Sequence, residues 1–262
     1  MRIGFVGAGR MGVPMIRRLV AAGHSVRAVG RNPATREAIS AAGATTAGSA
    51  AEAGADADAV VICVFTDDQV REVCLGSGLL DTMPPESVLI LHTTGSPDTA
   101  STIAAAGCRV VDAPVSGGPH NIAEGAITVF LGGEPEAVER ARPVLSAYAD
   151  PVLPVGALGN GQRVKLVNNA LFAAQIGLVT EAVRLAGQLG LAEGEVLAAL
   201  PHASSSSRAV LSVAAKGSVA AFSESVGDLL RKDVAVAREL ADRLGSDLGL
   251  LDPAIRAAVG PA

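Results

Sequence analysis

The chain is poor in aromatic residues and in cysteine. Its 262 residues include no tryptophan and one tyrosine, and the apolar fraction of 49% owes much to Ala, Val and Leu. The three cysteines, Cys63, Cys74 and Cys108, have no metal-binding spacing. An odd number of cysteines is typical of reduced thiols, so we expect a cytoplasmic protein without a metal site.

The chain also lacks the features of a nucleic-acid-binding or membrane protein. Its net charge of −5 at pH 7 provides no basic surface for nucleic acid. Charges or glycines interrupt the longest apolar stretches before about 18 residues, so no membrane span is predicted. The apolar run near the N-terminus is interpreted as a strand, not as a signal peptide. We therefore expect neither nucleic acid nor a membrane as a partner.

A glycine-rich motif stands near the start of the chain. It consists of Gly7, Ala8, Gly9, Arg10, Met11 and Gly12. A strand-like run over residues 3–6 precedes it, and a helix-like run over residues 13–22 follows. In such a motif the first glycine permits a tight turn, the second lets a pyrophosphate approach the backbone, and the third lets the helix pack closely. The context predicts a dinucleotide site; the alternative is an ordinary strand–turn–helix.

The second strand-like run, residues 25–29, leads into Gly30, Arg31 and Asn32. Enzymes that use NAD usually have an acidic residue here, which binds the ribose hydroxyls. No carboxylate is present, and a guanidinium matches a 2′-phosphate bidentately. The sequence therefore favours NADP(H) over NAD(H), which stays an alternative. Arg31 is either a ligand of that phosphate or a solvated surface residue.

Strand-like and helix-like segments alternate through the first half of the chain. The strand-like runs are residues 3–6, 25–29, 59–64, 88–91, 109–112 and 127–131. Helix-like stretches, among them residues 34–42, 67–75, 97–106 and 134–147, lie between most of them. Such alternation predicts α/β architecture with a Rossmann-type, doubly wound, mostly parallel sheet.

The strand signals stop after about residue 158. Residues 161–189 fit one long helix of about 40 Å at 1.5 Å per residue. Further helices are expected at residues 192–200, 208–215 and 226–244. We therefore predict an NAD(P)-binding domain over residues 1–158 and an all-helical domain, for substrate binding and dimerisation, over residues 159–262.

Three loops follow strand-like runs, and ligands of open α/β sheets bind beyond the carboxyl ends of the strands. One loop begins at Phe65, directly after Val64, and a second, residues 92–97, includes Thr94. The third contains Ser116, Gly117 and Gly118. In the third loop a hydroxyl stands beside two glycines whose N–H groups we expect to be unshielded. This favours a cradle for a carboxylate or hydroxyl; the alternative is a plain turn.

The long predicted helix carries Lys165 and Asn169, which lie on one face because they are four residues apart. Lys165 is flanked by apolar residues, which suggests partial burial. Burial lowers the pKa of a lysine towards neutrality, and such an amine can exchange protons with a substrate hydroxyl. The alternative is a surface lysine whose stem covers the helix.

Together these motifs resemble the β-hydroxyacid dehydrogenase family, which includes 3-hydroxyisobutyrate dehydrogenase and related semialdehyde reductases. The resemblance is carried by GFVGAGRMG from Gly4, DAPVSGG from Asp112, GNGQRVKLVNN from Gly159 and RKD from Arg231. The motifs cover nearly the whole chain. The resemblance implies a Rossmann-type domain, a helical domain, and NAD(P)-linked interconversion of a small 3-hydroxy acid and its semialdehyde or keto acid.

The resemblance also implies roles for individual residues. Lys165 corresponds to the general acid/base, and Asn169 hydrogen-bonds the substrate. Lys232 lies where a late lysine of the family approaches substrate or cofactor. The loop of Ser116, Gly117 and Gly118 binds substrate. The cofactor-binding residues are Gly7, Ala8, Gly9, Arg10, Met11, Gly12, Arg31, Asn32, Val64, Phe65 and Thr94.

Several residues depart from the family pattern. His92 stands where many members have an acidic residue. Pro119, His120 and Asn121 replace the usual small residues after Ser-Gly-Gly. We expect this replacement to alter the pocket and the substrate that it accepts. His120 is either a contact for a substrate anion or an exposed loop histidine. Fewer residues follow Lys232 than family members usually have, so we expect differences in how the pocket is enclosed and in the subunit interface.

Other classes of protein with this architecture match the sequence motifs less closely. The decarboxylating 6-phosphogluconate dehydrogenases have a histidine where Asn168 stands, and imine reductases typically have an acid or a tyrosine in place of Lys165. A non-catalytic NADP(H) sensor or scaffold would keep the cofactor domain, but the presence of Lys165 favours an enzyme.

The long helix also suggests an assembly. Its apolar residues Ala170, Leu171, Ala174 and Leu178 favour an interface with a second chain. Members of the family are commonly dimers or tetramers, so we expect a homodimer.

Overall fold

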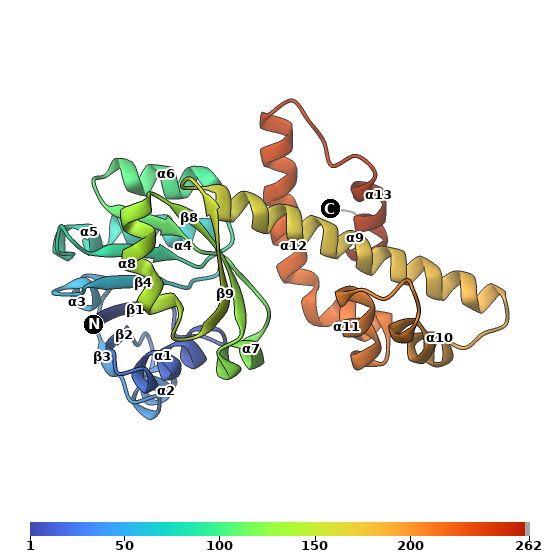
Figure 1. Cartoon of the computed structure of the whole chain (residues 1–262), viewed down its shortest axis with the longest axis horizontal. Coiled ribbons are helices and arrows are strands. Elements are labelled where there is room, and N and C mark those ends of the chain that lie inside the picture. Colours follow the sequence, from blue (N-terminus) through green and yellow to red (C-terminus); the bar gives the residue numbers. More distant parts are fainter. Residues whose placement is uncertain (260–262) are drawn as a thin grey trace. The chain divides into compact units, whose positions relative to one another are not determined.

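A computed structural model describes residues 1–259 (Figure 1). The chain divides into two compact units, Met1–Lys165 and Leu166–Ala262. The boundary falls inside the long helix α9 (Asn160–Gln188), so residues 160–165 of this helix belong with the sheet-containing unit.

The first unit is built on one mixed sheet. Its strands, among the described residues, are β1 (Arg2–Val6), β2 (Ser25–Val29), β3 (Thr45–Ala47), β4 (Ala59–Ile62), β5 (Val88–Leu91), β6 (Arg109–Asp112), β7 (Val115–Ser116), β8 (Ile127–Gly133) and β9 (Ala149–Gly156). Their order is β3-β2-β1-β4-β5-β6-β8-β7, with β9 beside β8. β1 to β6 pair in parallel, whereas β8 is antiparallel to β6 and β7. The predicted doubly wound, mostly parallel Rossmann-type sheet is confirmed.

Alternating side chains on the central strands build one core on each face of the sheet. In β4, Val61 packs in the core that includes helices α1 (Gly12–Ala21) and α8 (Pro135–Leu145), whereas Val60 and Ile62 belong to the opposite core. Helices lie on both sides of the strands in Figure 1. The other helices of this unit are α2 (Pro33–Ala41), α3 (Ala50–Gly54), α4 (Asp67–Arg71), which continues into a π-helical turn (Glu72–Gly76), α5 (Leu79–Thr82), α6 (Pro97–Ala105) and α7 (Pro119–Glu124).

Three strands were not predicted, each for a physical reason. β3 and β7 have three and two residues, too few to show a period. β9 is mostly exposed and contains Pro151 and Pro154, so it lacks the alternation of a half-buried strand. The predicted strand over residues 59–64 ends at Ile62, because the backbone N–H of Val64 donates to the hydroxyl of Thr93 instead.

The second unit is a group of helices around its own core. α9 is followed by α10 (Glu193–Ala199), α11 (Arg208–Lys216), α12 (Val219–Arg243) and α13 (Leu251–Val259). The sequence predicted the first four helices, with α12 starting later than it does, but not α13. Gly177 allows α9 and α13 to approach closely, because a Cβ there would lie 1.8 Å from the carbonyl oxygen of Ala254.

Helix α9 is long and apolar enough to span a membrane by length and composition, contrary to the expectation from the sequence. Buried residues such as Ala173 and Ile176 place one face of this helix in the core of the second unit. Ala170 and Ala174 lie in this core too, so the prediction that they form an intermolecular surface is wrong. Leu171 and Leu178 are exposed.

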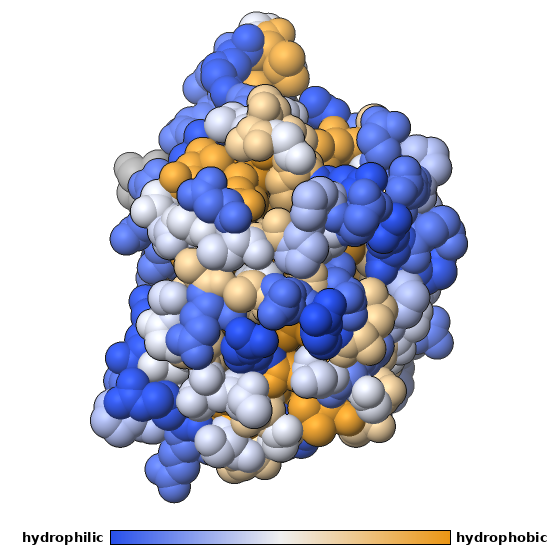
Figure 2. Space-filling model, turned by 90° about the vertical axis from the view of Figure 1, so that its left-hand side faces the viewer, coloured by the Kyte–Doolittle hydropathy of each residue, from blue (hydrophilic) through white to orange (hydrophobic). Residues whose placement is uncertain are grey.

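One face of the molecule is shown in Figure 2. Hydrophilic residues cover most of that face, and hydrophobic residues occur there only in small groups. Scattered apolar residues of this kind are normal on a protein surface and do not require a partner.

Candidate active site

The three glycines of the fingerprint have separate structural requirements. Gly7 has φ of +110°, and a Cβ there would lie 2.1 Å from the carbonyl oxygen of Cys63. A Cβ on Gly12 would lie 2.1 Å from the carbonyl oxygen of Gly7, so close helix–strand packing excludes a side chain. A Cβ on Gly9 would meet nothing within 4 Å. Gly9 therefore faces open space, which is where a pyrophosphate would approach the backbone at the start of α1.

The end of β2 presents two guanidinium groups. Arg31 is exposed, and Asn32 caps α2 by accepting a hydrogen bond from the Thr35 N–H at 2.8 Å. Arg36, which the sequence analysis did not single out, donates to the carbonyl of Gly30 at 3.1 Å. Gly30 is a glycine for that reason: a Cβ there would lie 2.4 Å from Cγ of Arg36. Arg31 and Arg36 thus lie near the end of β2, where residues 30–32 include no carboxylate.

The loop after β5 is held on both sides of Thr94. The Thr93 hydroxyl donates to the carbonyl of Val64 at 2.8 Å. The side chain of Gln162 accepts from the Gly95 N–H at 3.0 Å and donates to the Thr93 carbonyl at 2.8 Å. Thr94 is therefore carried on a backbone that the hydrogen bonds of its two neighbours hold in place.

The N-terminus of α9 is capped from a distant strand. Asp112, at the end of β6, is fully buried, and its two carboxylate oxygens accept from the N–H groups of Gly159 and Gln162, each at 2.7 Å. Burial raises the pKa of Asp112, against the opposite effect of these hydrogen bonds. Because Asp112 precedes the predicted substrate loop, the same carboxylate ties that loop to the turn of helix that leads to Lys165.

Lys165 is buried, with 9% of its surface exposed, which exceeds the predicted partial burial. It is the last residue of the first unit. Lysines are seldom this buried in proteins, so the burial argues against the alternative of a surface lysine whose stem covers the helix.

The substrate loop differs in one detail from the expectation. The N–H of Gly118 donates to the side-chain oxygen of Asn121 at 2.9 Å, so it is not unshielded. Gly117 has φ of +131° and also packs against Asn121, which excludes a side chain there. The ring of exposed His120 lies beside Gly118, where a Cβ would be 3.0 Å from it. Asn121, one of the residues that depart from the family pattern, thus shapes the loop.

In the second unit, Asn169 and Lys232 meet at a carboxylate that the sequence analysis did not name. Asp233 is buried; it accepts a hydrogen bond from the Asn169 amide at 2.5 Å and forms an ion pair with Lys232 at 2.7 Å. Asn168 donates to the side-chain oxygen of Asn169 at 2.9 Å. The predicted substrate ligands of this unit are therefore held by Asp233, which the motif RKD contains.

Comparison with known proteins identifies the family. The NAD-binding domain of 6-phosphogluconate dehydrogenase matches residues 2–157. The NAD-binding domain of NADP-dependent 3-hydroxyisobutyrate dehydrogenase matches residues 159–256. The chain belongs to the β-hydroxyacid dehydrogenase family. This membership confirms the resemblance of the sequence motifs and identifies the chain as an NAD(P)-linked oxidoreductase.

Individual β-hydroxyacid dehydrogenases agree with this assignment. A Mycobacterium tuberculosis protein named "probable 3-hydroxyisobutyrate dehydrogenase" is 37% identical over 192 residues, which are 72% of this chain and 65% of that protein. The NAD-dependent L-serine dehydrogenase of Pseudomonas aeruginosa is 35% identical over 217 residues, 81% of this chain and 72% of that protein. A solved structure of Mycobacterium tuberculosis 3-hydroxyisobutyrate dehydrogenase with L-serine matches this chain with a TM-score of 0.85 at 30% identity. The match covers 97% of this chain and 91% of the solved chain.

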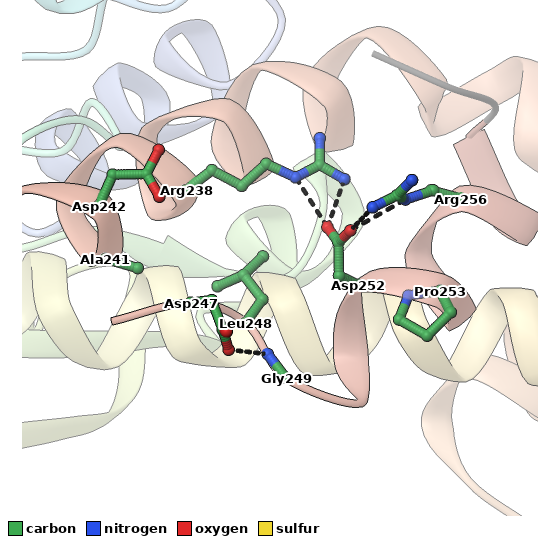
Figure 3. Close-up of a pocket in the computed structure, with 9 residues that line it drawn as sticks. All are labelled: Arg238, Ala241, Asp242, Asp247, Leu248, Gly249, Asp252, Pro253 and Arg256. Carbon is green, nitrogen blue, oxygen red and sulfur yellow. Dashed lines mark hydrogen bonds and ion pairs between the residues drawn. The ribbon is translucent and has the colours of Figure 1, made fainter. Parts of the chain in front are cut away.

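The helical domain of this β-hydroxyacid dehydrogenase contains a pocket of about 630 Å³ (Figure 3). None of the predicted site residues lines it. It is lined by the end of α12, the following loop and the start of α13. Asp252 points between Arg238 and Arg256 and forms ion pairs with both, at 2.8 Å to Arg238. Since the carboxylate of Asp252 is already paired and no predicted site residue lines the pocket, we assign the pocket no catalytic role.

Proposed function

We propose that the protein is an NADP(H)-preferring dehydrogenase that interconverts a small 3-hydroxy acid and its semialdehyde or keto acid, with Lys165 as the general acid/base. The observation that carries the proposal is the burial of Lys165 in a helix whose start is anchored to the sheet by Asp112 and Gln162. A group that transfers a proton must be held in a fixed position, and the anchored start of the helix holds Lys165 in this way.

The residues of the first unit fit a nicotinamide dinucleotide. Gly9 leaves open space at the start of α1, and the helix N-terminus offers N–H groups to the pyrophosphate. When bound, the nicotinamide supplies or accepts the hydride. The protein's task is then to orient the substrate and to move one proton.

In the reductive direction, Lys165 as an ammonium gives a proton to the oxygen of the developing alkoxide. In the oxidative direction, the neutral amine accepts the proton of the substrate hydroxyl. By the family match, Ser116, Gly117 and Gly118 bind the acid end of the substrate, and the same match assigns substrate contacts to Asn169 and Lys232. These contacts leave one substrate carbon towards the cofactor. The semialdehyde and hydroxy-acid classes are favoured because L-serine and 3-hydroxyisobutyrate appear in the names of the relatives.

The preference for NADP(H) rests on the basic end of β2. Arg31 is exposed there, no carboxylate competes within residues 30–32, and Arg36 lies against Gly30. A guanidinium stabilises a 2′-phosphate through paired hydrogen bonds. The relative from Pseudomonas aeruginosa is NAD-dependent, so the cofactor has to be tested directly.

The catalytic proposal is tested by following NADPH and NADH oxidation with succinic semialdehyde, methylmalonate semialdehyde, glyoxylate and tartronate semialdehyde. Lys165→Met is expected to lower kcat by roughly 10² to 10⁴ while NADPH binding persists. Lys216→Met, which removes an exposed lysine of α11, is the control and should keep wild-type turnover. Wild-type kcat in Lys165→Met would overturn the assignment.

The cofactor proposal needs a separate measurement. Arg31→Asp places a carboxylate where NAD-type sites have one, so the ratio of kcat/KM for NADPH to that for NADH should fall by at least about tenfold. Arg17→Asp, on the exposed surface of α1, is the charge-matched control. An unchanged ratio in Arg31→Asp would mean that this arginine is a solvated surface residue.

Two alternatives have their own signatures. An imine reductase-like enzyme would oxidise NADPH with a cyclic imine and with none of the acids. A sensor or scaffold would bind NADPH and consume none with either class of substrate.

A further inference from the structure

His92 forms a buried hydrogen-bonded link that the proposed reaction does not use. It follows β5 directly and is 3% exposed. Its Nδ1 lies 2.6 Å from the carbonyl oxygen of Ala113, and its Nε2 lies 2.8 Å from the hydroxyl of Tyr148. Tyr148, which lies between α8 and β9, has no exposed surface and packs edge-on against the imidazole.

The partners determine the state of the ring. A carbonyl oxygen only accepts, so Nδ1 of His92 must carry the hydrogen that it donates to Ala113. In the neutral ring Nε2 then has a lone pair, and the Tyr148 hydroxyl donates to it. Both ring nitrogens are satisfied in one tautomer, which gives the ring a single orientation.

The hydrogen bond between His92 and Ala113 joins two segments of the proposed active site, and Tyr148 holds the same ring from its other nitrogen. His92 begins the loop that carries Thr94, and Ala113 begins the segment after β6, which runs through Ser116 at the end of β7. β5 and β6 are parallel neighbours in which Leu91 pairs with Asp112, so both loops leave the sheet at the same edge. The imidazole therefore bridges the cofactor-side loop and the substrate-side loop at their roots.

We propose that His92 and Tyr148 are positioning residues that set the separation between the loop of Thr94 and the loop of Ser116. The inference rests on the proposed function, in which the first loop faces the nicotinamide and the second holds the acid. Losing the link is expected to misplace the substrate carbon relative to the cofactor, whereas the dinucleotide fingerprint at β1 is untouched. It should thus affect kcat and the KM for the acid more than the affinity for NADPH.

Tyr148→Phe is the sharpest variant, because it removes one hydroxyl and keeps the ring. His92→Asn is the second, since an amide can still donate to Ala113 but does not reach Tyr148. Ile39→Val is the control: it removes one methyl group from the same buried core, away from both loops. For each protein we would measure kcat, the KM for the best acid, the dissociation constant of NADPH, and hydrogen–deuterium exchange at residues 94–96 and 116–118.

Tyr148→Phe is expected to lower kcat/KM for the acid by roughly ten- to a hundredfold, with NADPH affinity within about twofold of wild type. Amide exchange in both loops should become faster in Tyr148→Phe. The control Ile39→Val should leave both kcat/KM for the acid and the loop exchange unchanged. Unchanged kcat/KM and unchanged loop exchange in both Tyr148→Phe and His92→Asn would overturn the proposal. If the wild type turns over no acid, the proposed function fails, and faster loop exchange still supports the link while unchanged exchange overturns it.

Discussion

At the scale of single residues, His92 gives the structure a defined response to acid. Burial lowers the pKa of His92 from its usual 6.5 to about 4, and the hydrogen bond to Ala113 opposes this only in part. Between these two values the unfolded chain binds a proton that the folded chain does not. Stability from this group is therefore complete above pH 6.5 and is lost as the pH falls towards 4.

The resulting prediction compares unfolding by urea at pH 7.5 and 5.5. Between pH 7.5 and pH 5.5, the free energy of unfolding of the wild type should fall by about 1.3 kcal/mol more than that of His92→Gln. Tyr148 is the one tyrosine of a chain without tryptophan, so its fluorescence reports unfolding of the first unit. His120→Gln removes an exposed histidine of the same unit and should keep the wild-type difference. Equal pH dependence in wild type and His92→Gln would contradict a buried neutral ring.

The fingerprint glycines separate folding from binding in a second residue-scale prediction. Gly7→Ala and Gly12→Ala place a methyl group 2.1 Å from a carbonyl oxygen, so both should lower the urea midpoint strongly. Gly9→Ala meets nothing within 4 Å and should fold like wild type, yet weaken NADPH binding by at least about tenfold, because the added methyl group occupies the path of the pyrophosphate. Wild-type affinity in Gly9→Ala would place the dinucleotide elsewhere.

At the scale of elements, the position of α9 depends on Asp112. In Asp112→Asn the amide oxygen can accept from one of the two N–H groups, and its NH₂ group faces the other donor. We expect a loss of about 1–3 kcal/mol in the free energy of unfolding, together with reduced kcat, since the start of the helix of Lys165 is no longer fixed. Glu124→Gln, at an exposed site in α7, is the control. Stability and kcat equal to the control would remove Asp112 from this role.

Sequence patterns predicted the elements that carry a local signal. β5 and β6 were predicted with the bounds that they have, because buried parallel strands appear as short apolar runs. β9 was missed because two prolines and exposure hide its period. The fingerprint was likewise visible, since its glycines are adjacent in sequence to β1 and α1.

The contacts that organise the candidate site were not predictable in this way. Gln162 bonds to Thr93 and Gly95 across 67 and more residues of chain, and such pairs leave no local pattern. Asp233 had a weak signal, as the residue beside Lys232 in the motif RKD, but its bond to Asn169 depends on how α9 and α12 pack. Sequence thus indicates which residues carry chemistry and leaves open which residues hold them.

At the scale of the whole molecule, the exposed side of α9 presents leucines at a regular interval. Leu171, Leu178 and Leu185 are 48%, 61% and 52% exposed. They are seven residues apart, and seven residues of an α-helix fall about 20° short of two turns, so the three side chains form nearly one line. Leucines arranged in this way are typical of helix–helix contacts. We propose that this line is the centre of a homodimer interface.

Light scattering coupled to size exclusion should give twice the chain mass of 26.1 kDa for wild type. Leu178→Lys combined with Leu185→Lys should give 26.1 kDa, because two charges in the line would lose their hydration on association. Leu211→Lys, at a site in α11 that is 46% exposed, is the matched control and should leave the mass doubled. A wild-type monomer would remove the interface altogether. A dimer that persists in the double variant would show that another surface joins the chains, because a charged line on α9 cannot be buried without cost.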